Sequence, residues 1–232
     1  MKVNFSVASS EFEARKFANY IKNYTKGYDD LMFRGLGVSI SEDFYVRIKS
    51  EEFSVIKEEL LLIISSSGNS NALENQLPLI ISGWESFEES LFDALNKVTS
   101  HEVIGTFDCF LLSFYKSGGY NVNSNTLWIY FKEGDYYGII HELFHLHYWK
   151  IWDSLFKDYD RDKAWKLSEV VVELVLRDSE VSRFLIPDRR KLVFWDEVQS
   201  LADKVLPLWS EHGGFDSFLK ESAGLSGVYS YP

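Results

Sequence analysis

Two histidines and a glutamate stand at a spacing that suits metal chemistry. They are His141, Glu142 and His145, in the segment GIIHELFHLHYWKIW. Residues four apart lie on one face of an α-helix, so the two imidazoles could bind one ion. Glu142 borders that face, and its carboxylate could reach a water molecule on the ion without being a ligand. The H-E-x-x-H spacing therefore predicts a zinc site suited to hydrolysis.

A second pair of candidate residues follows along the chain. Glu169 and Glu173 are the acidic residues of the apolar run WKLSEVVVELVL, and they too are four apart. Glu169 lies 24 positions beyond His145, which is enough chain for one helix to end and a second to return antiparallel. We predict that Glu169 is the third zinc ligand. We expect Glu173 to accept a hydrogen bond from the outer nitrogen of a ligand histidine, for which His141 is the first choice.

Other roles remain open for these residues. The histidines could be core residues with other partners, and the two glutamates could pair with Lys166 or Arg177 on their own helix. The roles of the two glutamates could also be exchanged. His147, two residues beyond His145, points off the ligand face, so we predict a structural role for it.

The segments HELFH and SEVVVE together resemble the zinc metallopeptidases of the gluzincin, thermolysin-like type. The resemblance covers about residues 105–180. It implies that zinc is bound by His141, His145 and Glu169, that Glu142 is the general base, and that Glu173 supports a ligand histidine. The sequence departs from the family pattern in having Glu173 where Asp is more usual and Ser168 where Asn is common.

The resemblance also implies a fold and a way of binding substrate. The fold would be α+β and zincin-like, with a small mixed or antiparallel sheet, an active-site helix and a mainly helical C-terminal half. A peptide substrate would add as a strand to the extended segment Gly118-Gly119-Tyr120-Asn121. The family's chemistry needs a donor that stabilises the oxyanion, and the sequence leaves this role open among Tyr120, Tyr148, His212 and Tyr229.

The pattern of apolar residues predicts the elements that carry these motifs. We expect helices at 8–26, 51–65, 84–98, 135–157, 161–178, 195–210 and 215–222, with Ser82 as the N-cap of the third. We expect strands at 103–116 and 126–132, a hairpin or short strands at 36–48, and polar connections at 65–76 and 117–125. This order indicates an α+β protein. We divide it into an N-terminal α/β portion, 1–100, and a zincin-like portion, 101–232, which could also form one continuous domain.

Composition limits the class of protein and its partners. The 232 residues are 46% hydrophobic, and 24 Lys and Arg against 35 Asp and Glu give a net charge of −11. This acidic balance argues against a nucleic-acid partner. The longest apolar stretch, Leu60–Ile64, predicts no membrane span. The start of the chain has no apolar secretion segment, and the single cysteine cannot form an internal disulfide, so we predict a cytoplasmic protein.

Together these features predict a zinc-dependent peptidase that acts on a peptide or protein substrate. The alternative is a zincin-fold module that binds zinc or a regulatory partner without turnover. The unassigned oxyanion donor and the predicted lack of an export signal favour the alternative to some degree.

Overall fold

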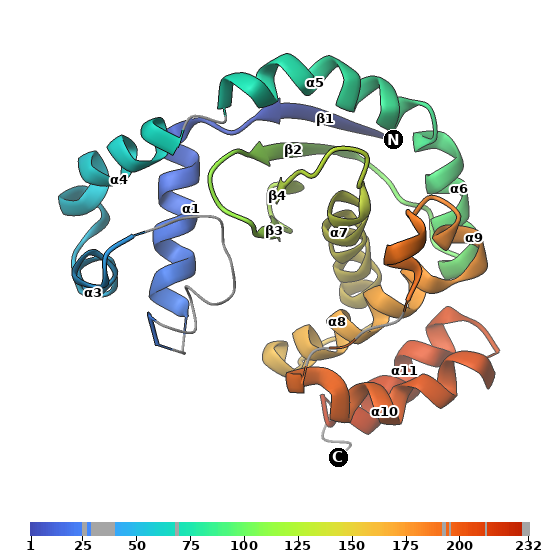
Figure 1. The fold of residues 1–232 in the computed structure, drawn as a ribbon. Helices are drawn as coiled ribbons and strands as arrows, with labels where there is room; N and C mark the ends of the chain where they lie inside the picture. Colours follow the sequence, from blue (N-terminus) through green and yellow to red (C-terminus); the bar gives the residue numbers. More distant parts are fainter. Residues whose placement is uncertain are drawn as a thin grey trace.

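The computed structural model describes residues 1–24, 27–28, 40–67, 70–191, 194, 196–211 and 213–228. Over these residues the chain is α+β and mostly helical, built around a small mixed sheet (Figure 1). The prediction of an α+β protein with a small mixed sheet is confirmed.

The sheet has four strands in the order β1-β2-β4-β3. The strands are β1 (Lys2–Val7), β2 (Thr106–Leu112), β3 (Gly118–Asn121) and β4 (Thr126–Tyr130). Strands β1 and β4 both run parallel to β2, whereas β3 is antiparallel to β4 and forms an edge of the described sheet. Strands β2 and β4 lie within the predicted strands. Strand β1 has no counterpart among the predicted elements, and β3 lies inside the segment 117–125 that we expected to be a connection.

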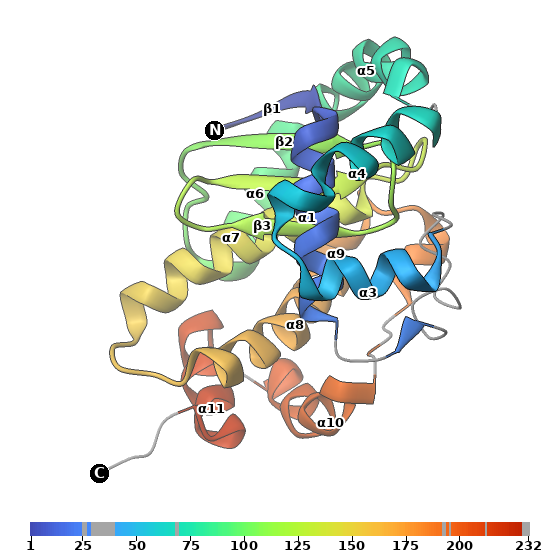
Figure 2. The ribbon, with the colours of Figure 1, turned by 90° about the vertical axis from the view of Figure 1, so that its left-hand side faces the viewer.

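Each face of the sheet packs against its own helices. Phe107, Cys109 and Leu111 of β2 belong to the core that contains α7 (Tyr137–Leu155), whereas the alternate residues Phe110 and Leu112 pack with the opposite helices. Those helices are α1 (Ser10–Asn23), α3 (Glu42–Ser50) and α4 (Phe53–Ser67). In Figure 2, α1 crosses in front of the strands and α7 lies behind them. The period-2 alternation of a strand thus places α7 against one face of the sheet.

The remaining helices extend the core on the α7 side. They are α5 (Ser70–Glu85), α6 (Glu88–Thr99), α8 (Arg161–Arg177), α9 (Ser179–Ser182), α10 (Asp196–Glu211) and α11 (Phe215–Ser226). The 3-10 helix η1 (Pro187–Arg190) follows α9 and has no buried residue. In Figure 1, α5 runs alongside β1, and α8, α10 and α11 lie together at the C-terminal side. The predicted helices at 135–157 and 161–178 correspond to α7 and α8. Buried residues of α5 and α6 belong to the same hydrophobic cluster as those of α7, α8, α10 and α11.

The prediction of a hairpin or short strands at 36–48 is wrong for the part of this segment that the structure describes. Residues 36–39 lie outside the described residues, and helix α3 begins at Glu42. The Ser41 hydroxyl caps this helix by accepting a hydrogen bond from the Phe44 amide at 3.2 Å. Phe44 and Ile48 are buried one turn apart, so packing against α1 and α4 selects the helix over a strand.

The polar connection predicted at 65–76 and the helix predicted at 84–98 also need correction. Residues 68–69 lie outside the described residues, and α5 already begins at Ser70, because Leu73 and Trp84 bury its apolar side in the core. A break at residues 86–87 separates α5 from α6, so Ser82 lies inside α5 rather than at an N-cap. At this break the Trp84 indole nitrogen donates to Glu88 Oε1 at 2.6 Å.

Among the described residues, none of the helices combines the length and the apolar character that a bilayer-spanning segment needs.

Candidate metal centre

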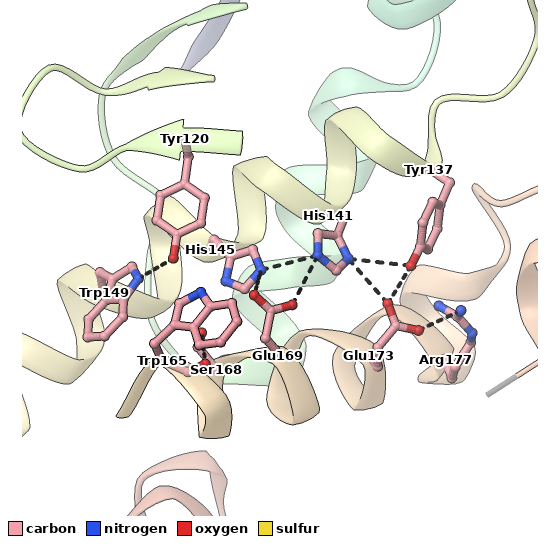
Figure 3. Close-up of polar contacts among 10 residues, drawn as sticks. All are labelled: Tyr120, Tyr137, His141, His145, Trp149, Trp165, Ser168, Glu169, Glu173 and Arg177. Carbon is pink, nitrogen blue, oxygen red and sulfur yellow. Dashed lines mark hydrogen bonds and ion pairs between the residues drawn. The ribbon is translucent and has the colours of Figure 1, made fainter. Parts of the chain in front are cut away.

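Helices α7 and α8 bring the predicted ligand residues together. They run antiparallel, since Tyr137 at the start of α7 lies near Arg177 at the end of α8 (Figure 3). The Asp160 side chain begins α8 by accepting hydrogen bonds from the amides of Asp162 and Lys163, both at 3.1 Å. The antiparallel return that the spacing predicted is therefore present.

Three candidate ligand atoms converge between the two helices. Nε2 of His141 and Nε2 of His145 are 3.1 Å apart. The Glu169 carboxylate faces both, with Oε1 3.4 Å from His145 Nε2 and Oε2 3.7 Å from His141 Nε2 (Figure 3). One ligand atom from each residue lies within 4.8 Å of the others, so this group could hold a metal ion.

The surroundings of these atoms fit a cation. His145 and Glu169 are buried, and the Glu169 Oε2 atom has no hydrogen-bond partner among the described residues. Burying a carboxylate oxygen without a partner is costly, and a cation between the three side chains would offset that cost. Two imidazole nitrogens and one carboxylate oxygen are a donor set that suits zinc.

Glu173 contacts the outer nitrogen of His141, as the spacing predicted. Its Oε1 atom is 3.2 Å from His141 Nδ1 and also accepts a hydrogen bond from the Tyr137 hydroxyl. Its Oε2 atom pairs with Arg177 Nη2 at 2.7 Å, so the alternative pairing on the same helix is present as well. Burial raises the pKa of Glu173, but the hydrogen bonds with His141 and Tyr137 outweigh this effect and leave the pKa below its usual value.

The sequence interpretation missed the supporting roles of Tyr137 and Arg177 in this group. Tyr137 precedes His141 by four positions, and Arg177 follows Glu173 by four. The same helical spacing that singled out the candidate ligands could have identified both of them as supporting residues. Arg177 was considered only as a competing partner.

Glu142 faces the cavity beside the candidate ligands. The Glu142 carboxylate lies close to strand β3: a Cβ atom added to Gly118 would be only 2.6 Å from Glu142 Oε1. Burial raises the pKa of Glu142 to about 7, and the charge of His141 opposes this rise. A carboxyl group with this pKa can hold or release a proton near neutral pH.

The candidate site opens into a cavity of about 1200 Å³. His141, Glu142, His145 and Glu169 line it, together with residues of the edge strand β3. The segment Gly118–Asn121, expected to be extended beside the metal, is strand β3 itself.

The candidates for the oxyanion donor fall in different places. Tyr120 lines the cavity, whereas Tyr148 is buried in the core and its hydroxyl donates to the Ala164 carbonyl at 3.4 Å. His212 and Tyr229 lie outside the described residues. His147 is also buried in the core, where its Nε2 atom is 3.2 Å from the Thr99 hydroxyl, in keeping with a structural role.

Comparisons with known proteins identify no relative of this chain. A scan against protein-family models, a search of curated proteins and a search of solved structures each found no match. The candidate metal centre is thus characterised by its own geometry: two imidazoles and a carboxylate that face one point, and a second carboxylate beside them in an open cavity.

Proposed function

We propose that the protein is a zinc-dependent hydrolase, specifically a peptidase of the gluzincin type. His141, His145 and Glu169 would hold the zinc ion, and Glu142 would act as the general base. The observation that carries this proposal is the convergence of three ligand atoms within 4.8 Å in a cavity that Glu142 also lines. Catalytic zinc sites typically have three protein ligands and one open position, and a His₂Glu set is one of their recurring forms.

The surrounding residues suit hydrolysis of a peptide bond. Zinc, when bound, would supply a Lewis acid that lowers the pKa of water and polarises a carbonyl group. Glu142 would take a proton from the attacking water and pass it to the leaving amine, and a pKa near 7 suits both steps. Glu173 would hold the proton on the outer nitrogen of His141 and so keep its other nitrogen free for the metal.

The position of strand β3 favours a peptide as the substrate. Of the described strands, only β4 pairs with β3, so the other edge of β3 can accept an extended chain. Gly118 and Gly119 line the same cavity as Glu142. A peptide added to this edge would therefore lie beside the proposed base.

The test is chelator-sensitive cleavage of a mixed peptide library, with metal analysis of the same preparation. We expect zinc in the purified protein, cleavage that stops on adding a chelator, and recovery on adding zinc. The variant Glu142→Gln should retain zinc but lose about 10²- to 10⁴-fold in turnover, which is the usual contribution of a general base.

Two results would count against the proposal. Full activity of Glu142→Gln would show that Glu142 is not the base. Bound zinc without chelator-sensitive cleavage would support the alternative, a zinc-binding or regulatory module without turnover.

A further inference from the structure

The two candidate ligand histidines differ in how their rings are held. The outer nitrogen of His141 contacts the Glu173 carboxylate at 3.2 Å. The outer nitrogen of His145, Nδ1, is buried and has no hydrogen-bond partner in the described part of the chain. A ligand histidine usually donates this N–H to a carboxylate or carbonyl oxygen, which fixes the orientation of the ring. Another contact must therefore orient His145.

The ring of Tyr120 lies against the face of the His145 imidazole. The two ring centroids are 4.7 Å apart and the planes are inclined by 17°, which is a stacked arrangement. Tyr120 comes from β3 and His145 from α7, so this contact joins the edge strand to the helix of the H-E-x-x-H motif (Figure 3). A stacked ring restricts rotation of the imidazole without needing its outer nitrogen.

Trp149 fixes Tyr120 in this position. Its indole nitrogen donates a hydrogen bond to the Tyr120 hydroxyl at 2.8 Å (Figure 3). Trp149 is buried and lies one helical turn beyond His145, on the same face of α7. Tyr120 is thus held at its ring by His145 and at its hydroxyl by the next turn of the same helix.

We propose that Tyr120, anchored by Trp149, is the positioning residue for His145. It takes the place of the hydrogen-bond acceptor that the described residues do not offer to Nδ1 of His145, and it keeps Nε2 of His145 directed at Nε2 of His141 and at the Glu169 carboxylate. The inference rests on the proposed function only in taking His145 as a metal ligand. Because Tyr120 belongs to β3, the same contact holds the proposed peptide-binding strand in place beside the metal.

Metal affinity without any peptide tests this role. Co²⁺ and Zn²⁺ are titrated into the protein in competition with a chelator of known affinity. Tyr120→Leu, which removes the stacked ring, should weaken binding about tenfold or more and shift the visible absorption bands of bound Co²⁺. Tyr120→Phe and Trp149→Phe keep the stacked ring and remove only the hydrogen bond that anchors it, so they should weaken binding less than Tyr120→Leu does. Tyr148→Phe removes a hydroxyl from the same helix that does not contact His145, and should bind as the wild type does.

A second measurement applies to the metal-free protein. Stacking under Tyr120 should shift the His145 ring protons in the NMR spectrum, and Tyr120→Leu should abolish that shift while Tyr120→Phe retains it. Circular dichroism checks that each variant is folded. Wild-type metal affinity in Tyr120→Leu, or an unchanged His145 signal, would overturn the positioning role.

These outcomes are separate from those that test catalysis. Suppose that the wild type cleaves peptides and that Tyr120→Leu binds metal as tightly as the wild type does. This result would refute the positioning role but not the proposed peptidase activity. The reverse result, weakened metal binding in Tyr120→Leu without any cleavage by the wild type, would refute the peptidase and support the positioning role. A wild-type protein that binds neither metal would overturn both.

Discussion

Glu169 and Glu173 lie one turn apart on α8, yet they contact different partners. The carboxylate of Glu169 faces Nε2 of both histidines. Glu173 lies between the outer nitrogen of His141, the Tyr137 hydroxyl and the Arg177 guanidinium. Arg177 neutralises the charge of Glu173, whereas the described contacts leave Glu169 Oε2 without a hydrogen-bond partner. This difference favours Glu169 as the metal ligand and Glu173 as the supporting residue in the proposed site.

Removing each carboxylate should therefore affect metal binding differently. We expect Glu169→Ala to lose the metal on purification, because a ligand atom is gone. Glu173→Ala should keep the metal with an affinity lowered about 10- to 100-fold, as is typical when a residue supporting a ligand is removed. Metal analysis and chelator competition measure both effects.

The exposed Glu221 on α11 provides the control, because Glu221→Ala removes a carboxylate far along the chain from the ligands and should change nothing. If Glu169→Ala kept the metal and Glu173→Ala lost it, the roles of the two glutamates would be exchanged.

At the scale of elements, α7 approaches the sheet closely at Gly138. A Cβ atom at this position would lie 2.7 Å from Cδ1 and Cγ1 of Ile129 on β4. Glycine in a helix is less favourable than alanine by about 1 kcal/mol. The close contact with Ile129 explains why a glycine stands here, because it leaves no room for a Cβ atom. The approach sets the depth at which the motif helix lies against β4.

The variant Gly138→Ala should therefore destabilise the protein by about 1–3 kcal/mol, despite the better helix propensity of alanine, because it overpacks the contact with Ile129. Urea unfolding measures the change in the free energy of unfolding. Shortening the partner in the double variant Gly138→Ala/Ile129→Val should recover part of the loss.

Gly224 in α11 is the matched control, since an added Cβ there would meet no atom of the described residues within 4 Å. Gly224→Ala should be neutral or stabilising by up to about 1 kcal/mol. Equal stabilisation by both alanine variants would show that α7 does not depend on a glycine at this contact.

At the scale of the whole molecule, a cation between α7 and α8 would join two parts of the core. Helix α7 packs against the sheet, and α8 packs against α10 and α11. The candidate ligands come from both helices, so the folded arrangement brings them together and an unfolded chain does not. Metal binding should therefore favour the folded state.

We expect zinc to raise the melting temperature. At a free zinc concentration one hundred times the Kd, the added stability is about 2.7 kcal/mol. For a chain of 232 residues this corresponds to a rise of about 5–10 °C in Tm. Differential scanning calorimetry with zinc, with a chelator and with Mg²⁺ measures the effect, and Mg²⁺ should have none because it prefers oxygen ligands. The same rise in Glu169→Ala would place the zinc elsewhere.

What the sequence alone determined is local. The spacing of four residues relates His141 to His145 and Glu169 to Glu173, and the apolar pattern around them predicts the helices that became α7 and α8. A single helical turn sets these relations, so nearby residues are enough to predict them.

Only the tertiary structure decided which distant segments meet. In the structure β1 pairs with β2, and the residues from Ser70 onward form helix α5. Gly118 lies beside Glu142, and Tyr120 stacks on His145. These contacts join residues that no helical or strand period relates, and their formation depends on how α7 packs against the sheet. The spacing of the candidate ligands could therefore be read from the sequence, whereas the contacts that hold these side chains in place required the fold.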